Sequence, residues 1–281
     1  MRINHNVSAM ITQGSLFKTN RSLGKNLEKL STGLRVNRAS DDAAGLGVSE
    51  NLRTQVRGTA QASRNAQDGI AVLTIAEGAA NEISAVLQRM RELAIQSAND
   101  TLTSVERGYT QAEFAQLQAE IDRIADVTNY NGMDLLSSAT DRFGVAGNNI
   151  LWVDANDTVG IDSITVTINE LTASGLSIDT ASANLDTQTD AVAAIGDLDS
   201  AIDSVNTMRS DMGSYINRLD HAINNLSVSN TNQQAAESLI RDVDFANETS
   251  DFTKNQILIQ SATSMLAQAN MIPQSVLQLL G

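Results

Sequence analysis

The chain has 281 residues, with 33 acidic and 19 basic side chains and a formal net charge of −14. This charge disfavours nucleic-acid binding, because phosphate neutralisation requires clustered lysine and arginine. The sequence has no cysteine, which excludes disulfides, thiolate catalysis and cysteine-based metal sites. Aromatic residues make up 3% of the chain and Pro273 is its one proline, so long unbroken helices are favoured over a thick globular core.

Membrane insertion and signal-dependent secretion are also disfavoured. No apolar run approaches the roughly 18 residues of a membrane span, so we predict no span. Residues 1–6 contain no apolar core of a cleavable secretory signal. If the protein leaves the cytoplasm, we therefore expect export by another route.

The N-terminal segment has leucines at spacings of three, four and seven, which share one narrow helix face that packs against another helix. The leucines of this predicted stripe are Leu16, Leu23, Leu27, Leu30 and Leu34. A polar, glycine-containing passage follows at residues 37–47. There, Ser40 or Asp41 is the predicted N-cap of a second helix.

A long seam then steps by threes and fours and predicts a long helix that ends near Asn99. Its members are Leu73, Ala76, Ala80, Ile83, Leu87, Met90 and Ala94. Thr103 and Glu106 have the spacing of a capping box and open a third helix. The apolar stripe of this helix is Phe114, Leu117, Ile121 and Ile124. Asn131 and Gly132 are a turn signal that ends it.

The middle of the chain changes to β-strand alternation. Apolar and β-branched residues at 150–153 and 164–168 flank turn-forming residues at 154–160, which predicts a β-hairpin. The turn is rich in aspartate but lacks the ligand spacing of a Ca²⁺ loop, so a turn is the preferred interpretation. Serine, threonine, alanine and aspartate dominate the following residues, 172–190.

Two further helices are predicted in the C-terminal half. The first has an apolar seam that Arg209 interrupts: Val192, Ile195, Leu198, Ile202, Val205, Met212, Leu219, Ile223 and Leu226. The last helix has a stripe much like that of the N-terminal segment: Leu258, Ala262, Met265, Ala269, Ile272, Val276 and Leu279. Leu266 and Leu279 are expected to be buried between packed helices once subunits assemble.

The predicted fold class is mainly α: a long antiparallel helical bundle or coiled coil with a small β-hairpin in the middle of the chain. The two apolar ends are expected to pair with each other. Residues 1–40 and 236–281 would be the N- and C-terminal ribbons of an inner terminal-helix domain. Residues 41–136 and 191–235 would be the two halves of a helical bundle domain, and 137–190 the hairpin with a short variable segment.

Catalysis is not predicted. His5 and His221 are the only imidazoles, and neither has a cysteine partner or a glycine-rich phosphate loop nearby. Of the three carboxylates Asp197, Asp199 and Asp203, only the last two share a helix face. We therefore assign no catalytic residue, no metal site and no cofactor.

Several long motifs resemble the N- and C-terminal regions of bacterial flagellin, in the same order as in that family. In the first half they are INHN at 3–6, LSTGLRVNRASDDAAGL at 30–46, LQRMRELAIQSAN at 87–99 and YNG at 130–132. In the second half they are IRDVDFA at 240–246, QSA at 260–262, AQAN at 267–270 and PQSVLQLL at 273–280. The resemblance covers roughly residues 1–136 and 191–281. It identifies the chain as a short form with little or no outer domain.

The resemblance implies a structural subunit that polymerises into the flagellar filament for motility, with the terminal helices forming the inner tube. It implies type III export, an export chaperone that holds the C-terminal ribbon, and contacts with filament cap and junction proteins. The location would be the bacterial flagellum, extracellular, or periplasmic if the source keeps its filaments there.

The resemblance also implies an outside partner, the flagellin-sensing Toll-like receptor of hosts. The contact motif of the family matches Gln88, Arg89, Arg91, Glu92, Leu93, Gln96 and Glu113. Arg89, Glu92, Leu93 and Gln96 are spaced three or four apart, which predicts one exposed strip beside the buried seam. The alternative is that these residues serve contacts between subunits.

Two other functions remain as alternatives. A hook–filament junction protein has related terminal helices, although the detailed match at 30–46 and the short middle disfavour it. A coiled-coil binding module of unrelated function would share the stripes alone. Elongation of filament seeds by purified subunits distinguishes a filament subunit from both.

Overall fold

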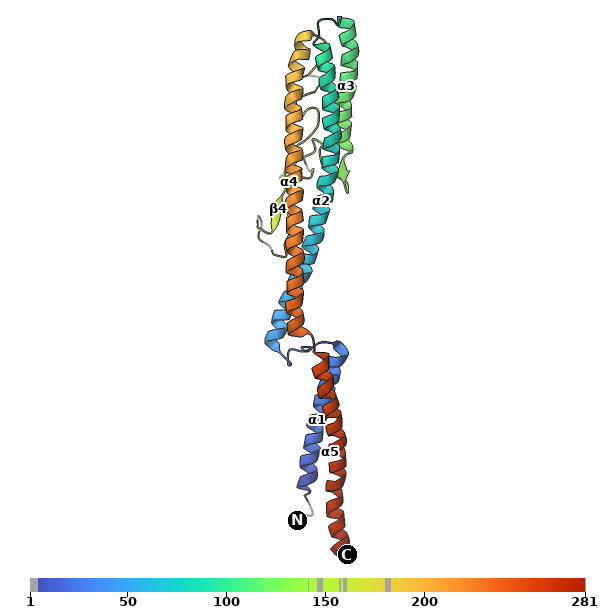
Figure 1. Ribbon diagram of the computed structural model, residues 1–281, viewed down its shortest axis with the longest axis vertical. Helices are drawn as coiled ribbons and strands as arrows, with labels where there is room; N and C mark the ends of the chain where they lie inside the picture. Colours follow the sequence, from blue (N-terminus) through green and yellow to red (C-terminus); the bar gives the residue numbers. More distant parts are fainter. Residues whose placement is uncertain are drawn as a thin grey trace. The chain divides into compact units, whose positions relative to one another are not determined.

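The chain is described here by a computed structural model that covers residues 5–140, 142–145, 149–156, 158, 161–179 and 183–280, with side chains up to Met271. The described elements, in chain order, are α1 (Val7–Thr32), α2 (Ala43–Ser97), α3 (Ser104–Val127), β1 (Asn129–Tyr130), β2 (Met133–Asp134), β3 (Ile150–Trp152), β4 (Ser163–Thr165), α4 (Gln188–Arg241) and α5 (Phe245–Leu280) (Figure 1). The predicted mainly α fold is confirmed.

The chain divides into two compact units. One contains Met1–Val56 and Thr231–Gly281, and the other contains Arg57–Asn230. Helices α2 and α4 each contribute to both units. The five-part domain scheme drawn from the sequence stays a prediction.

The core of the second unit is built from α2, α3 and α4. The predicted seam of α2 is confirmed, since all seven of its members, from Leu73 to Ala94, have no exposed surface. The N-cap prediction for α2 was wrong by a residue or more. Asp42 takes this role, because its Oδ1 accepts from the Gly45 amide at 2.8 Å, while Asp41 Oδ2 accepts from the Arg38 amide.

Helix α3 begins with the predicted capping box of Thr103 and Glu106. The hydrogen bonds from Thr103 lower the pKa of the Glu106 carboxyl, the backbone amide contributing most. Phe114 and Ile121 are fully buried as predicted, and Gln118 lies between them. Gln118 Nε2 donates to the carbonyl of Ile178 at 2.6 Å, while its buried Oε1 has no hydrogen-bond partner among the described residues.

Two antiparallel strand pairs follow. Asn131 and Gly132 form the turn between β1 and β2, with φ values of 52° and 78° that favour asparagine and glycine. The sequence predicted this turn but not the strands around it. The predicted hairpin is confirmed as β3 and β4, in which Leu151 pairs with Ile164.

The seam of α4 was only partly predicted. Leu198, Val205, Met212, Leu219 and Leu226 are buried, whereas Val192 is 57% exposed. Alanines and a methionine fill the rest of the buried face: Ala191, Ala194, Ala201 and Met208. Arg209 interrupts the seam and pairs with Glu77 at 2.9 Å.

Helix α2 is long and apolar enough to cross a membrane by length and composition, with an 18-residue window of mean hydropathy 1.5. The prediction that no segment approaches a span was therefore too strong. More than a third of that window, 39%, is buried inside the protein. The apolar character of α2 is thus explained by its packing in the bundle.

Candidate functional site

The terminal helices α1 and α5 pack along each other in antiparallel orientation, as the matching stripes predicted (Figure 1). At one end, Asn6 Nδ2 donates to the carbonyl of Ala269 at 2.7 Å. At the other end, the Val243 amide donates to the Gly33 carbonyl at 3.0 Å, and Leu34 forms a bridge with Asp242. The two chain ends therefore pair within one subunit.

The contact between the two helices is a seam of partly buried residues that step by threes and fours. In α1 these residues are Ala9, Thr12, Leu16, Thr19, Leu23, Asn26 and Leu30. In α5 they are Glu248, Phe252, Asn255, Ile259, Ala262, Leu266 and Ala269. About half of the seam is small or polar, so the pair buries few large apolar side chains.

Many large apolar side chains of both helices face away from this seam. In α1, Leu27 is 58% exposed although it belongs to the predicted stripe, and Phe17 is 72% exposed. In α5, Leu258 and Met265 are 45% and 57% exposed, so α1 leaves much of these two members of the predicted stripe uncovered. The side chains of Ile272, Val276 and Leu279 lie outside the described residues. Large apolar side chains left exposed in this number on two neighbouring helices mark interaction surfaces.

A polar cluster lies inside the seam. Asn26 is the only buried residue of α1, with 9% of its surface exposed. The partners of its amide set its orientation: Nδ2 donates to Glu248 Oε1 at 3.2 Å and to the Ser22 carbonyl at 2.9 Å. Its Oδ1 accepts from Asn255 Nδ2 and from the Phe252 amide, both at 3.2 Å. Asn26 therefore joins side chains of both helices in one network.

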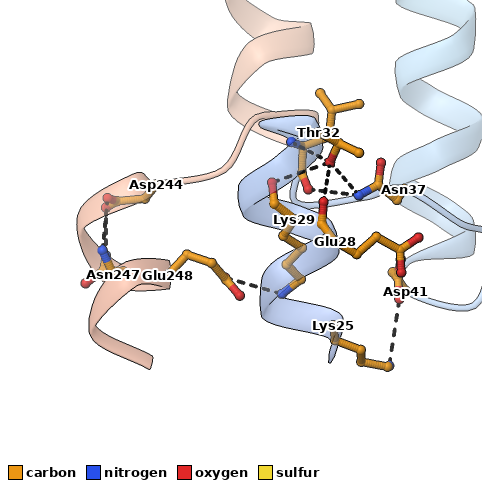
Figure 2. Close-up of polar contacts among 10 residues, drawn as sticks. Lys25, Glu28, Lys29, Thr32, Asn37, Asp41, Asp244, Asn247 and Glu248 are labelled. Carbon is orange, nitrogen blue, oxygen red and sulfur yellow. Dashed lines mark hydrogen bonds and ion pairs between the residues drawn. The ribbon is translucent and has the colours of Figure 1, made fainter. Parts of the chain in front are cut away.

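Charged and polar groups around the end of α1 extend this network (Figure 2). Lys29 Nζ lies 3.5 Å from Glu248 Oε2, and the Glu248 side chain is only 12% exposed. Beyond it, Asp244 caps α5 by accepting from the backbone amides that follow it. Asn37 Nδ2 donates to Thr32 Oγ1 at 2.7 Å, which fixes the chain where it leaves α1.

The predicted receptor-contact residues lie on α2 and α3. Arg89 bonds Glu92 at 3.0 Å and Glu113 at 2.8 Å, and these two carboxylates raise the pKa of its guanidinium, the hydrogen bond to Glu113 contributing most. Arg91 pairs with Asp199 of α4 and lowers the pKa of that carboxyl.

Gln88, Glu92 and Gln96 are exposed. Leu93 is only 2% exposed, so its predicted place in an exposed strip was wrong. The reason is that α2 packs against neighbours on more than one side, which buries a wider arc than the seam of Leu87, Met90 and Ala94.

The two histidines do not lie in an enclosed site. His5 and His221 are both exposed. Among the residues that the structure describes, no group of three or more histidine, aspartate or glutamate side chains could hold a metal ion.

The sequence interpretation missed the polar cluster and the exposed residues of α1. Asn26 follows Leu23 by three and precedes Leu30 by four, so its spacing alone places it in the seam. Phe17, Met10 and Ile11 are apolar residues outside the leucine stripe, and their number was the available signal for a second apolar face.

The comparisons with known proteins cover the whole chain and point to one family. The bacterial flagellin N-terminal helical region matches residues 3–141, and the bacterial flagellin C-terminal helical region matches residues 195–280. The chain is 48% identical to flagellin FlaB2 of Treponema pallidum (strain Nichols) and 49% identical to the flagellar filament 33 kDa core protein of Treponema phagedenis, in both cases over 100% of each chain. A crystal structure of Bacillus cereus flagellin is 34% identical, with a TM-score of 0.49, and covers 62% of this chain and 94% of its own.

These relatives are filament proteins, so the alternative of a hook–filament junction protein is not favoured. The chain belongs to the bacterial flagellin family and is a structural, non-enzymatic subunit of the flagellar filament.

Proposed function

We propose that α1 and α5 form the inner tube of the filament and that their exposed apolar faces are the contacts between subunits. The observation that carries this proposal is the exposure of Leu27, Leu258 and Met265 on two helices that pack along each other. Burial of such faces requires neighbouring molecules, and a homopolymer supplies identical ones at every position. Leu16, Leu23, Leu30 and Leu266 lie in the seam between α1 and α5 and would hold this pair together. The remaining residues of the proposed packing are Leu34, Ile272, Val276 and Leu279.

The test compares two adjacent apolar residues of α5. Leu258→Ala removes a side chain that α1 leaves exposed, so the subunit should keep its native protease resistance. A buried leucine-to-alanine change typically costs about 2–5 kcal/mol, and about 1.4 kcal/mol is a tenfold change in an equilibrium constant. The critical concentration for polymerisation should therefore rise at least about tenfold.

Two controls make the result specific. Ile259→Ala removes a residue that faces α1, so it should weaken the subunit and the polymer together. Gln260→Ala changes an exposed polar neighbour and should alter neither. An unchanged critical concentration for Leu258→Ala would contradict the proposed subunit contact.

We infer that the same C-terminal helix is held by an export chaperone before assembly. A long apolar helix face without a partner would otherwise aggregate, and a chaperone that covers it keeps the subunit soluble during type III export. A peptide of residues 244–281 should bind the chaperone, and a chain that ends at residue 241 should not. Equal binding of both would place the chaperone site elsewhere.

We further propose that the filament lies outside the cytoplasm, either beyond the cell or in the periplasm, where it contacts cap and junction proteins. Antibody labelling of intact and of permeabilised cells distinguishes the two locations. No labelling of intact cells, together with labelling confined to the cytoplasm after permeabilisation, would contradict export.

We propose a host contact at Gln88, Arg89, Arg91, Glu92, Leu93, Gln96 and Glu113, read by the Toll-like receptor that senses flagellin. The exposed, fixed guanidinium of Arg89 supports this proposal, because a rigid arginine is a frequent binding hot spot. Buried Leu93 would act through the packing of α2 rather than by direct contact. If the strip also serves subunit contacts, free subunits should activate the receptor and intact filaments should not.

A further inference from the structure

The hairpin of β3 and β4 closely approaches α2 at two glycines, Gly58 and Gly69. A Cβ atom added to Gly58 would lie 2.5 Å from Ala155 Cβ and 3.2 Å from Ala155 Cα. Contacts this short do not occur between real Cβ atoms, so only glycine lets the hairpin approach α2 here. The backbone of Ala155 cannot rotate away as a flexible side chain could.

A second glycine and one amide continue this contact along α2. A Cβ atom at Gly69 would lie 2.6 Å from Leu151 Cδ1. Between the two glycines, Asn65 Nδ2 donates to the Trp152 carbonyl at 3.3 Å. The steps from 58 to 65 and from 65 to 69 are seven and four residues, so all three positions share one helix face.

The opposite face of the hairpin points outward. Because side chains alternate along a strand, Leu151 faces α2 while Ile150 and Trp152 face away from it. These two side chains are 42% and 37% exposed. The depth at which the hairpin lies on α2 therefore determines how far they stand from the bundle surface.

Close contact at a glycine is not a general property of α2. A Cβ atom at Gly78 of the same helix would meet no described atom within 4 Å, apart from its own helix backbone and chain neighbours. Glycine inside a helix normally destabilises it relative to alanine. Gly58 and Gly69 therefore have a packing reason that Gly78 lacks.

We propose that Gly58, Asn65 and Gly69 form a seat on α2 that positions the hairpin and, through it, the outward face of Ile150 and Trp152. The three are positioning residues, since they act on the subunit surface through the hairpin. The proposal concerns the isolated subunit and does not depend on which surfaces neighbouring subunits use.

The test uses Trp152, the single tryptophan of the chain, as a reporter of hairpin position. Gly58→Ala should displace the hairpin, shift the Trp152 emission to longer wavelength and increase its quenching by acrylamide. Since Trp152 is 37% exposed, complete release would raise its exposed surface roughly two- to threefold, with quenching following. Gly69→Ala should have a smaller effect, because the Leu151 side chain can rotate.

Gly78→Ala is the matched control: it makes the same chemical change in the same helix and should leave Trp152 emission unchanged. The decisive variant is Ala155→Gly in the Gly58→Ala background, which removes the clashing methyl from the other side. Restored quenching in this double variant is expected, since a general weakening of α2 would not be repaired there.

Two results would overturn the proposal. One is native Trp152 quenching in Gly58→Ala, and the other is failure of Ala155→Gly to restore it. If Gly58→Ala does not fold, Asn65→Ala removes only the hydrogen bond to the Trp152 carbonyl and must still increase quenching.

Discussion

Replacing Asn26 by alanine should weaken the α1–α5 pair without affecting the helical bundle. The change removes the amide that accepts from Asn255 and the Phe252 backbone and donates to Glu248. Asn255 Nδ2 would then lose its acceptor inside the seam. Glu248 keeps its ion pair with Lys29, so the damage is confined to the amide network.

The size of the effect follows from two opposing terms. A buried polar group left without its partner costs about 1–3 kcal/mol. Alanine regains about 0.5 kcal/mol of helix propensity over asparagine. The net weakening is therefore about 0.5–2.5 kcal/mol, which raises the population of the opened pair roughly two- to seventyfold.

Native-state proteolysis of the soluble subunit measures this population directly. Cleavage follows the equilibrium fraction of the open form when closing is fast compared with cleavage. The rate of cuts within α1 and α5 should rise by the same factor, while cuts in the bundle stay slow. Because the seam buries few large side chains, the native subunit should itself be trimmed at both ends first.

Thr19→Ala is the matched control for this change. Thr19 also lies in the α1 seam, but its hydroxyl donates to the Ser15 carbonyl of its own helix at 3.0 Å. The substitution gains similar helix propensity and breaks no cross-helix bond. Equal cleavage rates for Asn26→Ala and the native chain, or equal acceleration by Thr19→Ala, would refute the role of the amide.

Three further predictions concern the bundle. Phe114→Ala empties a fully buried site and should cost about 3–5 kcal/mol in thermal unfolding of the bundle; a loss below about 1 kcal/mol would mean that the site collapses onto its neighbours. The lowered pKa of Glu106 means that its carboxylate stabilises the fold fully above its ordinary value of 4.5, and that this contribution is lost as pH falls through the lower folded value. The stability advantage of the native chain over Glu106→Ala should therefore shrink below about pH 4.5, and a constant difference would contradict the capping role. Arg89→Ala breaks exposed ion pairs and should hardly change the melting temperature, so reduced polymerisation or receptor activation would report a lost surface contact.

The sequence predicted those features that depend only on local residue spacing. The seam from Leu73 to Ala94 and the capping box of Thr103 are of this kind, since periodicity and cap chemistry act locally. In helix α5, local spacing does not determine which face is buried. Leu258 and Met265 are spaced seven apart, and so are Ile259 and Leu266, so the sequence offers two equivalent stripes. Only the position of α1 decides which stripe is covered within the subunit.

The N-cap of α2 and the buried residues of the polar segment could not be predicted from the sequence, for a different reason. Three adjacent residues, Ser40, Asp41 and Asp42, can all act as an N-cap, and tertiary contacts choose among them. The polar passage at 172–190 was expected to be a variable segment, yet its Ile178 and Leu185 are fully buried. Isolated apolar residues in a polar segment have no repeated spacing that would predict a buried face. Their burial depends on the bundle surface that they cover.

Seeded polymerisation tests the central conclusion most directly. Purified subunits added to short filament fragments should elongate them into long fibres, with a critical concentration that rises when Leu258 or Met265 is replaced by alanine. Removal of residues 245–281 should abolish elongation while leaving the bundle folded. Subunits that fail to elongate seeds, or that elongate them equally well without α5, would contradict assembly through the terminal helices.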